Sequence, residues 1–159
     1  DRMASLVSKK KVPVIVMHIK GTPKNMQEKP YYRDVISEIT GYFAKRIKYA
    51  LSKGIKKENI ILDPGIGFGK TTAHNLTILK NLKKFSGLGF KLAIGTSRKS
   101  FIGKILGSEQ KPLPADERLE GSIVTALIAA QEGVKILRVH DVRETKKALR
   151  IFEEIRSIQ

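Results

Sequence analysis

The chain has 159 residues, enough for one domain with its own core, and we expect a single domain over residues 1–159. It contains no cysteine, which excludes disulfides, thiol nucleophiles and cysteine-based metal sites. No apolar run reaches the roughly 18 residues of a membrane helix, and the first residues lack the layout of a signal peptide. A soluble cytoplasmic protein is the resulting expectation.

The formal net charge is +16, from 31 Lys and Arg against 15 Asp and Glu, and such an excess raises nucleic acid as a partner. The lysines are scattered along the chain with few aromatic residues among them to stack bases. We therefore favour a solvated lysine-rich surface over a nucleic-acid site. A second explanation is that residues on another chain or segment balance the excess.

Strands and helices are predicted to alternate along the chain. A strand at 12–18 is followed by a helix at 32–52, a strand at 60–63, a helix at 75–85 and a strand at 91–97. A short helix after residue 99, a helix at 117–131, a strand at 134–141 and a helix at 142–158 complete the series. This alternation predicts an α/β fold with a parallel sheet and right-handed crossovers.

Each predicted strand ends in polar or ionisable residues, and α/β folds place their chemistry at the carboxyl ends of parallel strands. We therefore expect one active-site rim built from these strand ends: His18, Asp63, Ser97 and His140.

A glycine-rich turn follows Asp63, with glycines at positions 65, 67 and 69. The nucleotide P-loop pattern would require glycine at Pro64, and the dinucleotide pattern would require it at Lys70 or Thr72. Both nucleotide patterns therefore fail here. The plain alternative is a glycine-rich turn beside one solvated aspartate.

The residue types on the predicted rim suit one kind of ligand. Arg98 and Lys99 stand near the start of a helix, a position that favours an anion or a carbonyl-rich ring. Arg138 and His140 share one face of a strand and suit a diphosphate. Asp63 suits a paired N–H edge. We therefore interpret the pocket as one in which a carboxylate binds the amino edge of a heterocycle and a lysine binds its carbonyl. An arginine and a histidine would bind phosphates.

Five segments in order resemble the dihydropteroate synthases, the folate-pathway enzymes that sulfonamides inhibit. They are M-H-I-K-G-T-P-K-N-M-Q at 17–27, L-D-P-G-I-G-F-G-K-T at 62–71, G-T-S-R-K-S-F-I-G at 95–103, E-R-L-E-G-S at 117–122 and R-V-H-D-V-R-E-T at 138–145. The resemblance implies a TIM (β/α)8 barrel of the pterin-binding type, with the C-terminal half, strands five to eight, present in this chain.

The resemblance also implies a reaction. A 7,8-dihydropterin-6-ylmethyl diphosphate would condense with 4-aminobenzoate to give 7,8-dihydropteroate and diphosphate, helped by Mg²⁺. Residues implied to bind the pterin are Asp63, Lys99, Arg138, Met17 and Gly95. Those implied for the diphosphate are Arg138 and His140, and those for 4-aminobenzoate are Ser97, Arg98 and Phe68. Met17 and Phe68 have no separate support from residue chemistry.

The resemblance leaves part of the enzyme outside this chain. The N-terminal half of the barrel would be a required partner and would carry the Mg²⁺ ligands. The complete enzyme would be a homodimer. The absence of an initiating methionine agrees with an interior fragment. Two alternatives stay open: a pterin-binding methyltransferase domain, and a basic non-enzymatic fragment that binds nucleic acid or a partner subunit.

Overall fold

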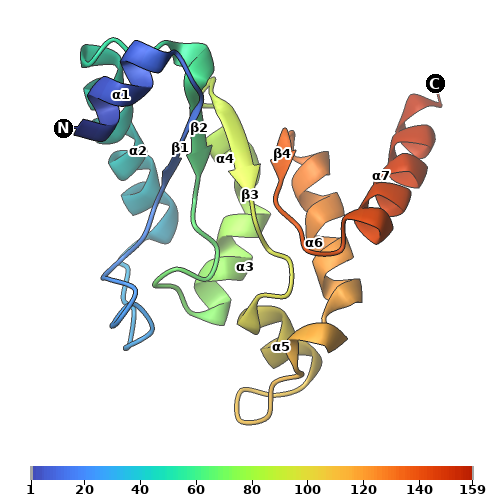
Figure 1. Ribbon diagram of the computed structural model, residues 1–159. Coiled ribbons are helices and arrows are strands. Elements are labelled where there is room, and N and C mark those ends of the chain that lie inside the picture. Colours follow the sequence, from blue (N-terminus) through green and yellow to red (C-terminus); the bar gives the residue numbers. More distant parts are fainter. Residues whose placement is uncertain (1, 159) are drawn as a thin grey trace.

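The computed structural model describes residues 2–158. Four parallel strands form one open sheet in chain order: β1 (Val14–Met17), β2 (Ile60–Asp63), β3 (Lys91–Ile94) and β4 (Ile136–Leu137). The helices are α1 (Arg2–Lys10), α2 (Val35–Ser52), α3 (Thr72–Lys80), α4 (Leu82–Ser86), α5 (Ser100–Leu106), α6 (Leu119–Gln131) and α7 (Val142–Ser157). Short 3₁₀ turns lie at Lys57–Asn59 and Ala115–Glu117. Figure 1 shows the sheet and the helices that connect its successive strands along the chain. The predicted α/β alternation is confirmed.

Several boundaries differ from the expected ones. The segment 134–141 pairs as a strand only at Ile136–Leu137, because its neighbour β3 itself ends at Ile94. The expected helix at 75–85 is two helices, α3 and α4, separated at Asn81. Asn81 leaves helical geometry, with φ −117° and ψ 20°, and its side chain donates to the Thr77 carbonyl at 2.8 Å. Helix α1 lacks a counterpart in the sequence-based expectation.

Helix α2 illustrates how local sequence sets the layers. Asp34 caps its start by accepting a hydrogen bond from the Ser37 backbone N–H, and Gly54, at φ +76°, follows its end. One face is buried at helical spacing against the sheet: Val35, Ile36, Ile39, Phe43 and Ala50. Full burial of each of the larger side chains, the valine, isoleucines and phenylalanine, contributes about 1.5–3 kcal/mol.

The core lies between the sheet and its helices. All four residues of β2 are buried, as in a central parallel strand. Phe43 of α2 packs edge-on against Phe85 of α4, with ring centroids 6.0 Å apart. This layer fixes the carboxyl end of β2, where Asp63 stands.

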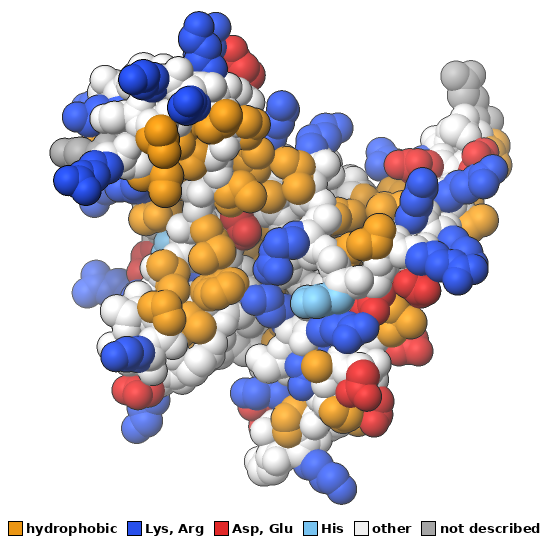
Figure 2. All heavy atoms as spheres, viewed as in Figure 1, with side chains coloured by type: hydrophobic (Ala, Val, Ile, Leu, Met, Phe, Trp, Pro, Cys, Tyr) orange, Lys and Arg blue, Asp and Glu red, His pale blue; other side chains and the backbone are white. Residues whose placement is uncertain are grey.

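The outer strands are less covered. Ile15 in β1 is 53% exposed, and both residues of β4 are only partly buried. Figure 2 shows hydrophobic side chains exposed in patches over the sheet on this face, with Lys and Arg spread around them. Within residues 2–158, no helix is both long and apolar enough to cross a membrane.

Candidate active site at the carboxyl ends of the strands

The strand ends meet on one rim. Because all four strands are parallel, His18 after β1, Asp63 at the end of β2, Ser97 after β3 and His140 after β4 stand at the same end of the sheet. The His18 N–H donates to the Asp63 carbonyl at 2.9 Å, which continues the β1–β2 pairing past Met17. The four predicted strand ends therefore lie at one end of the sheet, as expected.

Asp63 is a buried carboxylate among cations. Its Oδ1 accepts the Gly65 N–H at 2.7 Å. Burial raises the pKa of Asp63, while the Gly65 hydrogen bond and the charges of Arg138, Lys99 and Lys70 act in the opposite direction. The carboxylate therefore has one oxygen committed to the turn and cations near enough to stabilise its charge.

Gly65 makes this approach possible. Its φ is +68°, and a Cβ there would lie 1.9 Å from the His18 carbonyl oxygen. Only glycine fits, because a side chain would clash with the backbone at the end of β1.

Lys99 stands opposite Asp63 and is half-buried. Its Nζ lies 4.1 Å from the centroid of the Phe68 ring, a cation–π contact. Burial lowers the pKa of Lys99, the charge of Arg138 lowers it further, and Asp63 opposes both. The glycine-rich turn thus supplies an aromatic face that holds the lysine at the rim.

Arg138 lies against the backbone at the end of β3. A Cβ on Gly95 would come within 2.7 Å of the Arg138 Nη2, so glycine at 95 leaves room for the guanidinium. The Arg138 N–H donates to the Ile94 carbonyl at 2.8 Å, which anchors the residue to β3. Arg138 itself is exposed at the mouth of the rim.

Ser97 and His140 are joined directly. Ser97 Oγ lies 2.9 Å from His140 Nδ1, and the His140 backbone N–H donates to the same Oγ at 3.1 Å. Ser97 is buried, while the His140 residue is exposed.

Arg98 is placed differently from its neighbours. Its φ is +57°, and its guanidinium forms a two-point ion pair with Asp141 that raises the pKa of Arg98 and lowers that of Asp141. Its backbone N–H donates to Ser122 Oγ at 2.9 Å, and its carbonyl accepts from Arg118 at 2.8 Å. The Arg98 side chain therefore serves the loop after β4.

Sequence reasoning missed a buried basic pair behind the rim. Lys70 and His18 are only 4% and 7% exposed, and Lys70 Nζ lies 3.1 Å from His18 Nδ1. Lys70 also donates to the Phe68 carbonyl at 3.0 Å. Burial lowers the pKa of Lys70 to about 7; burial and then the Lys70 charge lower that of His18 to about 4. A lysine directly after a glycine-rich turn was the available signal.

Three further side chains hold the glycine-rich turn. Asn75 Oδ1 accepts the Gly67 N–H at 2.8 Å, and Gln27 donates to the Gly67 carbonyl at 2.7 Å. Tyr32 OH donates to the Gly69 carbonyl at 2.9 Å. Gln27 and Tyr32 come from the loop between β1 and α2, and Asn75 comes from α3 directly after the turn. None of these contacts was predicted from the sequence.

Met17 closes the inner end of the rim. It is partly buried at the end of β1, its carbonyl accepts from Tyr42 OH at 3.0 Å, and its Cγ stands 3.4 Å from a Cβ built on Gly65. Met17 therefore lines the space next to the turn that carries Phe68.

The family resemblance implies a Mg²⁺ ion. Mg²⁺ binds oxygen ligands, chiefly carboxylates and water. Within residues 2–158 there is no group of three or more His, Asp or Glu side chains able to hold an ion. The described residues therefore contribute no cluster of ion-binding side chains of this size.

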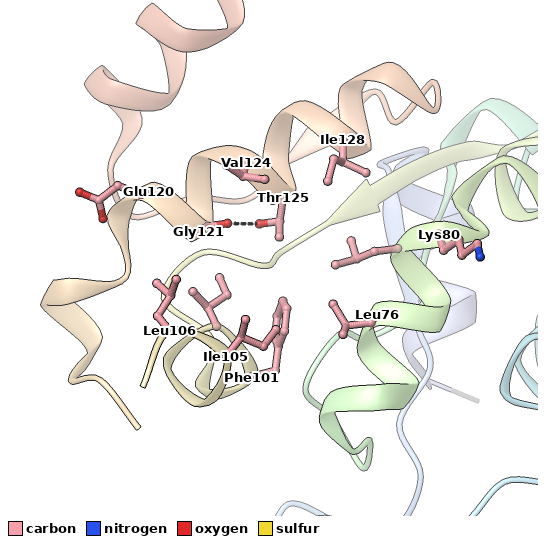
Figure 3. Close-up of a pocket in the computed structure, with 12 residues that line it drawn as sticks. Leu76, Lys80, Phe101, Ile105, Leu106, Glu120, Gly121, Val124, Thr125 and Ile128 are labelled. Atoms are coloured by element: carbon pink, nitrogen blue, oxygen red, sulfur yellow. Dashed lines mark hydrogen bonds between the residues drawn. The ribbon is translucent and has the colours of Figure 1, made fainter. Parts of the chain in front are cut away.

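A separate apolar groove of about 480 Å³ lies among α3, α5 and α6. Figure 3 shows its lining side chains converging from these three helices, with Lys80 and Glu120 toward opposite ends. Several lining residues are exposed: Leu76, Ile105, Leu106, Val124 and Ile128. The groove is distinct from the rim that holds Asp63.

Comparison with known proteins identifies the family to which this chain belongs. A family model described as pterin binding enzyme matches residues 1–140. The chain belongs to the pterin binding enzyme family. Dihydropteroate synthases of Haemophilus influenzae and Escherichia coli are each 46% identical to it over 142 residues, which is 89% of this chain and 50% and 49% of those proteins.

Solved structures agree with this family membership. The Yersinia pestis dihydropteroate synthase with a sulfonamide drug complex superposes with a TM-score of 0.91 at 41% identity, over 98% of this chain and 55% of that one. The Thermus thermophilus enzyme in complex with 6HMPPP gives 0.90 at 37%, over 98% and 60%. The expected TIM-barrel fold of a pterin-binding enzyme is confirmed, and the chain spans about half the length of the curated relatives it matches.

Proposed function

We propose that this chain forms the C-terminal half of a dihydropteroate synthase. The observation that carries the proposal is the cluster of Asp63, Lys99 and Arg138 on one rim of a pterin binding enzyme family member. Its similarity to synthases crystallised with 6HMPPP and with 4-aminobenzoate supports the same substrates here.

The pterin ring occupies the space between β2 and β3 in this proposal. The free acceptor capacity of Asp63 pairs with the amino and ring N–H groups, and Lys99 donates to the ring carbonyl. The guanidinium of Arg138 lies flat against the ring. The close approach of this guanidinium to Gly95 supports that placement. Met17 lines the same pocket.

In this proposal the diphosphate and the 4-aminobenzoate extend outward from the pterin. Arg138 and His140 hold the diphosphate, because both are exposed at the mouth and both donate hydrogen bonds. Ser97, Arg98 and Phe68 border the 4-aminobenzoate. A pterin-binding methyltransferase has no diphosphate to bind, so the Arg138–His140 pair favours the synthase.

The chemistry is a displacement at the methylene carbon of the pterin. The amine nitrogen of 4-aminobenzoate forms the new C–N bond, the C–O bond to diphosphate breaks, and the nitrogen loses a proton. Arg138 and His140 stabilise charge on the departing diphosphate. The rim residues thereby orient both reactants and favour the leaving group.

Several parts of the enzyme lie outside this chain in the proposal. The N-terminal half of the barrel closes the rim and carries the protein ligands of the Mg²⁺ cofactor. The complete enzyme is proposed to be cytoplasmic.

We also propose that the complete enzyme is a homodimer joined through the groove among α3, α5 and α6. The groove carries Lys80 and Glu120 toward opposite ends, so a two-fold copy can place each lysine near the partner's glutamate. Val124→Glu should convert the dimer to a monomer in analytical ultracentrifugation. An unchanged dimer mass would refute this interface.

The reaction itself is tested by pyrophosphate release from the chain combined with a complementary N-terminal half. Release should require the pterin diphosphate and 4-aminobenzoate together, and a sulfonamide should inhibit it by competing with 4-aminobenzoate. Release without the aromatic amine, or methyl transfer from a methylated pterin, would contradict the proposal.

A further inference from the structure

Ser97 and His140 face each other across the gap between the loops that follow β3 and β4. Ile94 pairs with Leu137 in the sheet, and the same sequence separation of 43 brings Ser97 opposite His140. The Oγ–Nδ1 distance is 2.9 Å, and the His140 backbone N–H donates to the same oxygen at 3.1 Å. One hydroxyl therefore makes two contacts with one histidine.

Counting protons assigns the direction of the side-chain contact. A serine hydroxyl has one proton to donate and lone pairs to accept. Ser97 Oγ already accepts the His140 backbone N–H, and the residue is 4% exposed, which leaves it little contact with water. Within residues 2–158, His140 Nδ1 is the acceptor available to it. A proton on Nδ1 would leave the buried hydroxyl proton without an acceptor.

A second buried serine, in the first turn of α6, follows this rule. Ser122 is 3% exposed, accepts the Arg98 backbone N–H at 2.9 Å and donates to the Arg118 carbonyl at 2.6 Å. Each serine thus accepts from a backbone N–H and donates to one acceptor. For Ser97 that acceptor is an imidazole nitrogen, so the hydrogen bond determines which ring nitrogen carries the proton.

We propose that Ser97 is a positioning residue that holds His140 in the tautomer with its proton on Nε2. Because Nδ1 is occupied by the serine, the exposed ring presents Nε2–H as a fixed donor at the rim beside Arg138. Resting on the proposed function, this donor meets a diphosphate oxygen. The main task of Ser97 is then to orient His140 rather than to bind 4-aminobenzoate through its hydroxyl.

The tautomer is tested by long-range proton–nitrogen NMR of the histidine-labelled 159-residue chain near pH 8.5, well above the ordinary imidazole pKa of about 6.5. The chain has three histidines, and His140→Gln assigns the relevant signals. His140 should show a protonated Nε2 and an unprotonated Nδ1. Ser97→Ala should give a mixture of tautomers, whereas the control Ser86→Ala, which removes a hydroxyl at the end of α4, should leave the His140 signals unchanged.

The consequence for binding is measured with inorganic pyrophosphate by calorimetry, on the chain joined to its N-terminal half. Ser97→Ala should weaken pyrophosphate binding about three- to tenfold, the value of one net hydrogen bond. A protonated Nδ1 in the unchanged chain, or an unaltered tautomer in Ser97→Ala, would overturn the positioning role. A changed tautomer with unchanged pyrophosphate affinity would instead overturn the diphosphate assignment of the proposed function.

Discussion

Asp63 is the residue on which the proposed recognition of the pterin depends most. It is buried, one oxygen is held by the Gly65 N–H, and the surrounding charges of Arg138, Lys99 and Lys70 oppose the rise in its pKa that burial causes. An ionised carboxylate in a buried site is a strong acceptor for paired N–H groups. Its role can be tested without changing its size.

Asp63→Asn should weaken pterin binding by about tenfold or more in the chain joined to its N-terminal half. The amide replaces an acceptor with a donor, and an unpaired buried group costs about 1–3 kcal/mol. Calorimetry with a dihydropterin ligand measures the effect, and Asp116→Asn, at an exposed position, is the control. Equal affinity in both variants would refute the assignment of Asp63.

Lys70 should make stability depend on pH. Its pKa falls from 10.5 to about 7 on folding, so the folded state binds fewer protons than the unfolded state between these values. The free energy of unfolding should therefore rise as the pH increases through this window.

In Lys70→Met this rise should shrink by on the order of 2 kcal/mol between about pH 7 and pH 9, as measured by urea unfolding. Lys80→Met, which removes an exposed lysine, should keep the rise. Parallel pH profiles for the two variants would show that Lys70 is not the titrating group.

Residue chemistry alone predicted the meeting of Asp63, Lys99, Arg138 and His140, because strand ends in a parallel sheet share one edge. It did not predict the pairing of Lys70 with His18. That contact joins the end of β1 to the turn after β2, and no spacing within either segment encodes it. The ligand roles of Met17 and Phe68 stay predictions of the family resemblance.

At the scale of elements, the glycine-rich turn after β2 is the feature that shapes the rim. Its glycines adopt positive φ, and side chains from the loop between β1 and α2 and from α3 hold its backbone. Phe68 is thereby presented to Lys99, so the turn links the ends of β2 and β3.

Gly65→Ala should destabilise the chain by more than about 1 kcal/mol, because alanine disfavours positive φ and its Cβ would meet the His18 carbonyl. Gly41→Ala is the matched control, since a Cβ there has open space on helix α2. It should stabilise by about 0.5–1 kcal/mol. Chemical denaturation measures both, and losses of equal size would contradict the role of Gly65.

Element boundaries were predictable where local signals were strong. Gly54 was predicted to stop α2 and does so, and the buried run of β2 was found in full. The start of α2 was expected at residue 32, whereas the helix begins at Val35 after the Asp34 cap. The division between α3 and α4 was missed, because Asn81 ends α3 through a hydrogen bond to Thr77 that the apolar pattern does not reveal. The short β4 depends on how far its neighbour extends, which is a tertiary property.

At the scale of the whole molecule, the four-stranded sheet is an open arc. Within the part of the chain that the structure describes, β1 and β4 each pair on one side only, and Ile15 is more than half exposed. Free strand edges with apolar side chains favour association with another sheet. Two open edges are what the proposed half barrel predicts.

The isolated chain should therefore associate readily and turn over no substrate. Addition of the N-terminal half should cover the edges of β1 and β4 and reduce self-association in size-exclusion chromatography at matched concentration. A stable monomer in the absence of the other half would contradict this expectation.

The most direct test of the half-barrel proposal is pyrophosphate release measured for each half alone and for the two halves mixed. The prediction is no release above background from this chain or from the N-terminal half, and restored release from the mixture. Release by this chain alone, as a verified monomer, would contradict it, and so would an inactive mixture in which the two halves are shown to form a stable complex.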